Sequence, residues 1–77
     1  MKQVLDDTLN RIAEAQGYPE QAPEFGERAW RVKGRCGDII YWDIGNGWCD
    51  IMRIIPKKEH EGWLQQVFDM IESSDDA

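Results

Sequence analysis

A β-hairpin centred on Asn46 is the feature that most constrains the fold of this 77-residue chain. Two runs rich in β-branched and aromatic residues, 39–44 and 48–55, flank a Gly-Asn-Gly sequence. A tight hairpin turn needs residues that tolerate a positive φ, and asparagine and glycine do so most readily. Trp30 and Val32 alternate with Arg31 and Lys33, and a short glycine-bearing turn separates them from the hairpin. The pattern therefore predicts three consecutive antiparallel strands, the last ending at Pro56.

A helix is predicted on either side of these strands. Residues 3–16 carry apolar side chains at helical spacing, with two aspartates near the start, where the helix dipole favours anions. A second amphipathic pattern predicts a helix over residues 58–72. Residues 17–27 hold two prolines and two glycines, which indicates a loop. Tyr18 and Phe25 are expected to pin that loop to the core.

These elements predict one small domain over residues 1–77, in the order α-β-β-β-α, with residues 73–77 as a disordered tail. The predicted fold class is α+β with two layers. One layer is a three-stranded antiparallel sheet, and the other is formed by the two helices packed on one face of it.

The length of the hairpin loop decides which sheet face the helices cover. A two-residue loop places a largely apolar set on one face, which we expect to be the core: Ile40, Trp42, Ile44, Cys49, Ile51 and Arg53. The face left open would then carry Ile39, Tyr41, Trp48, Met52 and Ile54. A three-residue loop would shift the pairing by one residue and bring Trp48 and Met52 into the core instead. The sequence leaves both arrangements open.

Charge and composition argue against several classes of function. Fifteen acidic and nine basic residues give a net charge of −6, which disfavours direct nucleic-acid binding and docking on an anionic membrane. No apolar run is long enough to span a membrane, and the acidic N-terminal segment does not resemble a signal peptide. The two cysteines are fewer than small secreted domains usually carry. We therefore expect a cytoplasmic protein.

No catalytic, cofactor or metal site can be assembled from the sequence. His60 is the only histidine, and no spacing ties it to a cysteine nucleophile. Cys36 and Cys49 have no zinc-ligand spacing, and the predicted strands hold them beyond disulfide reach, with Cys49 in the core. Neither glycine-bearing turn leads into a helix N-terminus, so no phosphate-binding loop is predicted. We expect a protein that is not an enzyme and has no cofactor.

Charged residues are segregated along the chain. Residues 28–37 carry four basic and no acidic side chains, whereas residues 59–77 carry six acidic side chains and no lysine or arginine. Basic residues at a sheet edge commonly prevent edge-to-edge pairing. They can also hold a small anion, and the candidates for such a site are Arg31, Lys33, Arg35 and Arg53.

A protein-binding surface is the other prediction from composition. Four tryptophans in so short a chain should leave some apolar surface exposed, and an apolar stripe flanked by acids suits a protein or dimer interface. The alternative is a sheet covered on both faces, with the loop over residues 17–27 on the second face. The candidate protein-binding residues are Tyr41, Asp43, Trp48, Asp50, Met52, Asp69, Glu72, Asp75 and Asp76.

The acidic C-terminal segment carries a family resemblance. It runs from Lys58-Glu59-His60-Glu61 through Leu64 and includes Glu72-Ser73-Ser74-Asp75-Asp76. This segment, about nineteen residues, resembles the acidic C-terminal helix of DinI-like proteins, which modulate RecA. The resemblance implies a modulator of RecA.

Three functions are therefore expected, in this order. The first is an acidic, non-enzymatic protein-binding module, similar in type to phage or prophage inhibitors and regulators. It would bind a basic partner, such as a nucleic-acid-handling protein, by imitating nucleic-acid charge, and the open sheet face would also support a homodimer. The second is a protein that binds or sequesters a small anion such as a nucleotide. The third is a RecA modulator of the DinI-like type.

Overall fold

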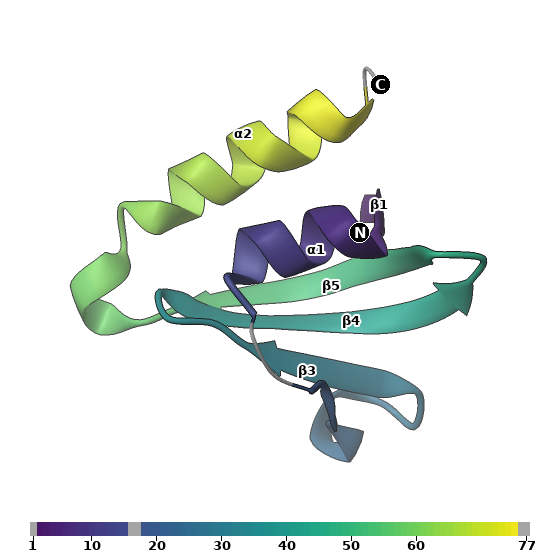
Figure 1. The fold of residues 1–77 in the computed structure, drawn as a ribbon. Helices are drawn as coiled ribbons and strands as arrows, with labels where there is room; N and C mark the ends of the chain where they lie inside the picture. The colour runs from purple at the N-terminus through teal and green to yellow at the C-terminus, as the bar shows by residue number, and fades with distance from the viewer. Residues whose placement is uncertain (1, 16–17, 76–77) are drawn as a thin grey trace.

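Two α-helices and a five-stranded antiparallel sheet make up the fold in the computed structural model, which describes residues 2–15 and 18–75 (Figure 1). The strands are β1 (Lys2–Leu5), β2 (Glu20–Gln21), β3 (Ala29–Lys33), β4 (Gly37–Gly45) and β5 (Trp48–Pro56). They pair in the order β1-β5-β4-β3-β2. The helices are α1 (Asp6–Ala13) and α2 (Trp63–Asp75), with short 3-10 helices η1 (Pro23–Phe25) and η2 (Lys58–His60). The α+β class is confirmed, but β1 and β2 extend the predicted three-stranded sheet to five strands.

Both helices lie over the same face of the sheet, which we call the helix face (Figure 1). The main core lies between the helices and this face, and its buried residues are Val4, Leu9, Ile12, Ala13, Val32, Cys36, Ile39, Tyr41, Cys49, Ile51, Trp63, Val67 and Ile71. The predicted burial of Cys49 is confirmed. A smaller cluster of Ala22, Ala29 and Ile40 lies on the other side of the sheet, which we call the open face.

The β4–β5 hairpin turns at a two-residue loop, as the Asn-Gly sequence predicts. Asn46 and Gly47 have φ values of 59° and 82°, the positive pair that such a turn requires. Directly beyond the turn, Ile44 is an extra residue in β4, because the strand pairs on either side of it are Asp43–Cys49 and Gly45–Trp48. A one-residue insertion of this kind is a β-bulge, and it shifts the register of every pair that follows.

A second bulge restores the original register farther along the hairpin. Here Met52 is the extra residue, in β5, because the pairs on either side are Tyr41–Ile51 and Ile40–Arg53. Between the two bulges the strands are offset by one residue from the pairing that an uninterrupted hairpin would have. Each such offset moves side chains to the other face of the sheet.

The two bulges overturn the predicted assignment of faces. The helix face carries Ile39, Tyr41, Cys49, Ile51 and Ile54, so only Cys49 and Ile51 of the predicted core set lie there. Ile40, Trp42, Arg53, Trp48 and Met52 belong to the open face. The three-residue alternative is also wrong, because neither Trp48 nor Met52 enters the main core.

The N-terminal segment begins with a strand and not with the predicted helix over residues 3–16. β1 pairs antiparallel with β5 and places the fully buried Val4 opposite Cys49. Without β1, the edge of β5 would present unpaired backbone groups, so pairing there outweighs helical spacing in this short stretch. The backbone N–H of Asp6 then donates to the carbonyl oxygen of Gly47 at 2.8 Å, and α1 begins. The helix ends where Glu14 adopts a left-handed conformation, with φ 55°.

The C-terminal helix starts later and ends later than predicted. Residues 58–60 form η2, and α2 runs from Trp63 to Asp75. The helix thus includes the first three residues of the predicted tail, and residues 76–77 lie outside the described residues. Trp63, Val67 and Ile71 are the buried residues on α2, whereas Phe68 remains 43% exposed. Trp63 packs so closely on Gly37 that a Cβ there would lie 2.4 Å from the indole ring.

The predicted loop over residues 17–27 contains β2 and η1, and it covers part of the open face. Tyr18 is 94% exposed, so the expectation that it pins the loop is wrong. Phe25 is half-buried against the smaller cluster, with the Arg53 guanidinium 5.9 Å from its ring centroid. The suggestion that this loop covers the second sheet face is therefore confirmed only near Phe25.

Candidate functional site

Four large apolar side chains are exposed together at the hairpin end of the sheet. Leu5, Trp42, Ile44 and Trp48, which we call the hairpin patch, are each between 40% and 46% exposed. Leu5 pairs with Trp48 across β1 and β5, directly after the buried Val4–Cys49 pair. Because successive side chains point to opposite faces of a sheet, Leu5 and Trp48 lie on the open face. Trp42 lies on the same face because it is next to Tyr41, which belongs to the helix-face core.

The rest of the described chain covers the hairpin patch only in part: the loop after η1 approaches the Trp42 indole at Gly26, where an added Cβ would lie 3.8 Å from Nε1. β3 ends its pairing with β4 at Trp42, so the last residues of β4 extend beyond the neighbouring strand. The loop with η1 contacts the open face around Ile40 and Met52. A group of exposed apolar side chains of this kind commonly marks a surface that another molecule covers.

Carboxylates surround this end of the molecule. Residues 3–10 and 38–52 contain aspartates but no lysine or arginine. Asp43, at the hairpin, is exposed, and its Oδ1 accepts a hydrogen bond from the Gly45 N–H at 2.9 Å. Asp50 pairs in register with Trp42, within the patch. The hairpin end therefore combines apolar surface with negative charge.

A pocket of about 280 Å³ lies on the helix face at the same end of the hairpin. Its polar lining comes from α1 and β4, and the residues that line it are Asp6, Leu9, Asn10, Pro19, Val32, Tyr41 and Asp43. Tyr41 is only 7% exposed, and burial, together with the nearby charges of Cys49, Asp43 and Asp6, raises its pKa to about 12. At neutral pH the Tyr41 hydroxyl is therefore protonated and can donate or accept a hydrogen bond.

The Cys49 thiol is fully buried in the main core and stays protonated. Its burial raises its pKa to about 12, and Asp6 contributes through its charge and a hydrogen bond to the thiol. A thiol that remains protonated is a poor nucleophile. Cys36 is also buried, and its Sγ lies 3.8 Å from both carboxylate oxygens of Glu14. Both cysteines are free thiols.

The predicted protein-binding residues separate into three places. Asp43, Trp48 and Asp50 lie together at the hairpin end. Asp69 and Glu72 are exposed on α2, which is on the other side of the sheet from the hairpin patch (Figure 1). Tyr41 is buried in the main core and lines a pocket on the helix face, and Met52 is partly buried against the smaller cluster, so neither belongs to the hairpin patch. Asp75 is the last residue of α2, but its side chain and Asp76 lie outside the described residues.

Sequence reasoning missed Leu5, Trp42 and Ile44 as exposed side chains. Leu5 was expected on the buried face of a helix, and the other two were expected in the core. Their exposure follows from β1 and from the bulge at Ile44, which have no distinctive residue signature. The glycine that precedes Asn46 is a weak signal for irregular pairing, because glycine inside a strand pattern often accompanies a bulge.

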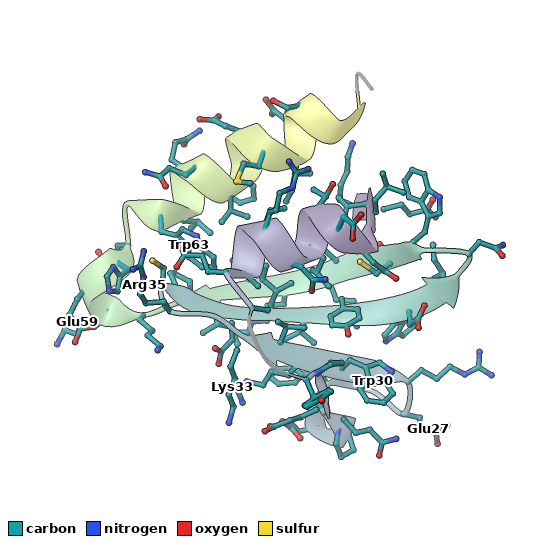
Figure 2. The ribbon with its side chains drawn as sticks, viewed as in Figure 1. Glu27, Trp30, Lys33, Arg35, Glu59 and Trp63 are labelled. Carbon is teal, nitrogen blue, oxygen red and sulfur yellow. The ribbon has the colours of Figure 1, made fainter. Side chains whose placement is uncertain are left out.

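The predicted anion-binding side chains already have partners. Arg31 donates to the Asp38 carboxylate, which raises the Arg31 pKa further, and the Arg31 Nε–Asp38 Oδ2 distance is 2.9 Å. Figure 2 shows Lys33 on the side of the sheet opposite the helices. The remaining contacts are Lys33 Nζ–Glu20 Oε2 at 3.5 Å, Arg35 Nε–Glu14 Oε2 at 3.1 Å, and Arg53 over Phe25. An anion would have to compete with these carboxylates.

Other candidate chemistry finds no support in the described ranges, 2–15 and 18–75. No three histidine, cysteine or acidic side chains there are placed to hold a metal ion. Neither helix has the length and apolar content of a transmembrane segment. His60 is half-buried in η2. The residues that resemble the DinI-like helix are divided between η2, a turn and α2, so they do not form one helix.

Comparison with known proteins adds no relative. No protein-family model, curated protein or solved structure matches this chain.

Proposed function

We propose that this protein is a non-enzymatic binding module that recognises another protein through the hairpin patch. The observation that supports the proposal is the exposure of Leu5, Trp42, Ile44 and Trp48 at the hairpin end of the sheet, three of them on the open face. Tryptophan is among the residues that contribute most to binding energy at protein interfaces, because its large apolar surface is removed from water on contact. Trp42 and Trp48 are the residues on which we expect affinity to depend.

The partner should present an apolar surface bordered by lysine or arginine. Asp43 and Asp50 lie at the patch, and residues 38–52 carry three aspartates and no lysine or arginine. A second copy of this chain would bring the same aspartates face to face, and like charges at an interface are unfavourable. A basic partner would gain from the same arrangement. By covering a basic surface, the module would inhibit or regulate that partner.

The test compares two variants that remove exposed aromatic side chains at different places. Trp42→Ser/Trp48→Ser removes the centre of the hairpin patch, whereas Phe68→Ser removes a 43% exposed side chain from α2. Each immobilised protein is used to capture proteins from a cell lysate, and a captured protein is then purified and titrated directly. We expect that protein to bind the wild type and Phe68→Ser, to lose at least tenfold in affinity for the double variant, and to bind more weakly at high salt.

Three results would overturn the proposal. The first is equal binding of the purified protein to the wild type and the double variant. The second is equal loss with Phe68→Ser, which would assign the effect to α2. The third is a wild-type dimer in sedimentation that the double variant converts to a monomer, which would make the hairpin patch a surface for self-association.

A further inference from the structure

The acidic pocket beside the hairpin has the features of a site for one organic cation. Asp6 and Asp43 contribute carboxylates from α1 and β4, and no lysine or arginine lines the pocket. Within the described residues, neither carboxylate has a salt bridge to a basic side chain. Asp6 accepts a hydrogen bond from the Cys49 thiol, and Asp43 accepts one from a backbone N–H. Neither carboxylate has a basic partner among the described residues.

The Tyr41 hydroxyl is the second, independent indication of a ligand. The Tyr41 side chain is more than nine-tenths buried, and the pocket includes it in its lining. Its hydroxyl makes no hydrogen bond to another described residue. No fully shielded side-chain oxygen is left without a partner in this part of the chain, so the hydroxyl oxygen is not fully shielded, and the pocket is an opening that Tyr41 lines. A tyrosine hydroxyl at a pocket can accept a hydrogen bond from a ligand that donates one.

The remaining lining suits the hydrocarbon stem of a cationic side chain. Leu9, Pro19 and Val32 are apolar, and Asn10 adds an amide that can accept a hydrogen bond. The volume of about 280 Å³ is slightly below that of sites for drug-sized ligands, so a single side chain is a suitable occupant. The two carboxylates supply too few oxygen ligands for calcium, which takes six to eight.

We propose that this pocket receives the ammonium or guanidinium group of a lysine or arginine side chain from the protein partner. The proposal rests on the proposed function, because that function supplies a basic partner at this end of the molecule. Asp43 is the residue between Trp42 and Ile44, so a partner seated on the hairpin patch would reach the pocket by extending one side chain past the β4 edge. The carboxylates would pair with the cation, and the Tyr41 oxygen would accept one of its hydrogen bonds.

The test needs no knowledge of the partner. Isotope-labelled protein is titrated with N-acetyl-lysinamide or N-acetyl-argininamide and followed by NMR. We expect saturable shifts of the backbone amides of Asn10, Tyr41 and Asp43 with the cationic probes, and none with the uncharged isostere N-acetyl-norleucinamide. Asp43→Asn should weaken binding at least tenfold, because it removes a charge-assisted hydrogen bond. Asp69→Asn removes the same charge from α2 and should leave the affinity within about twofold.

The Tyr41→Phe variant tests the role of the hydroxyl without disturbing the fold. The ring and its packing are kept, so the far-UV circular dichroism should not change, while the affinity for N-acetyl-lysinamide should fall several-fold. Absence of saturable shifts would overturn the proposal. So would equal binding of the norleucine probe, or equal loss with Asp43→Asn and Asp69→Asn.

A small diamine, 1,4-diaminobutane, distinguishes two possible occupants of the pocket, a lysine side chain of the partner and a free small amine. If it binds at least tenfold more tightly than N-acetyl-lysinamide, the pocket is a site for a free amine and the assignment to a partner side chain is wrong. The outcome is independent of the hairpin patch. Loss of the partner in the Trp42→Ser/Trp48→Ser variant would still support the proposed function if the pocket binds no cation.

Discussion

Raising the pH above 9 should destabilise this protein through the buried thiol of Cys49. In the folded protein its pKa rises from the ordinary value of 9.0 to about 12, because burial and the negative charge of Asp6 disfavour the thiolate. Between these two values the unfolded chain releases the proton and the folded chain keeps it. The contribution of the thiol to stability is therefore complete below pH 9 and is lost as the pH rises toward 12. At pH 10 the loss is on the order of 1 kcal/mol.

Urea unfolding at pH 8 and pH 10 under reducing conditions measures this loss. Cys49→Ala should be less stable than the wild type at both pH values, because it leaves a small cavity in the core. Its further loss between pH 8 and pH 10 should nevertheless be smaller than that of the wild type by about 1 kcal/mol, since it has no thiol to titrate. Taking the difference between the two proteins cancels the other groups that titrate in this range. An identical pH dependence in both would refute the reasoning.

Three further predictions concern the backbone and one ion pair. Gly34→Ala should prevent folding or lower the thermal midpoint steeply in circular dichroism, because its Cβ would lie 1.6 Å from a carbonyl oxygen at the end of α1. The control is Gly62→Ala, which has no atom within 4 Å of the new Cβ and should fold normally. Asn46→Ala should reduce the free energy of unfolding by about 1 kcal/mol in urea titrations, because alanine tolerates a φ of 59° poorly, and an unchanged value would contradict the left-handed turn. Asp38→Asn should lower the unfolding free energy by about 1 kcal/mol through its partly buried pair with Arg31, and the loss should shrink at high salt.

The hairpin was predictable because its signals are local. Asn46 and Gly47 encode a backbone conformation that few other residues adopt, and the flanking runs are long enough to be strands. The alternation around Val32 and the stop at Pro56 are equally local. The N-terminal strand was not predictable in this way. The apolar residues of the first segment fit a helix as well as a strand, and only the unpaired edge of β5 selects the strand.

The candidate site was only partly predictable for the same reason. The sequence indicated an exposed Trp48 with aspartates near it, and the structure places Asp43 and Asp50 at that end of the hairpin. It could not indicate that Trp42 belongs with them. That depends on the bulge at Ile44, which has no strong sequence signal.

The sequence by itself determined the α+β class, the position of the hairpin turn and the acidic character of the chain. Each of these depends on properties that can be read from short stretches of sequence: backbone preference, hydrophobic periodicity or charge. The tertiary structure decided which sheet face the helices cover and therefore which tryptophans reach solvent. Side chains alternate with a period of two along a strand, so one extra residue at a bulge exchanges the faces. Which face becomes the helix face depends on how α1 and α2 pack on the complete sheet. That packing involves residues far apart in the sequence, so no short segment reveals it.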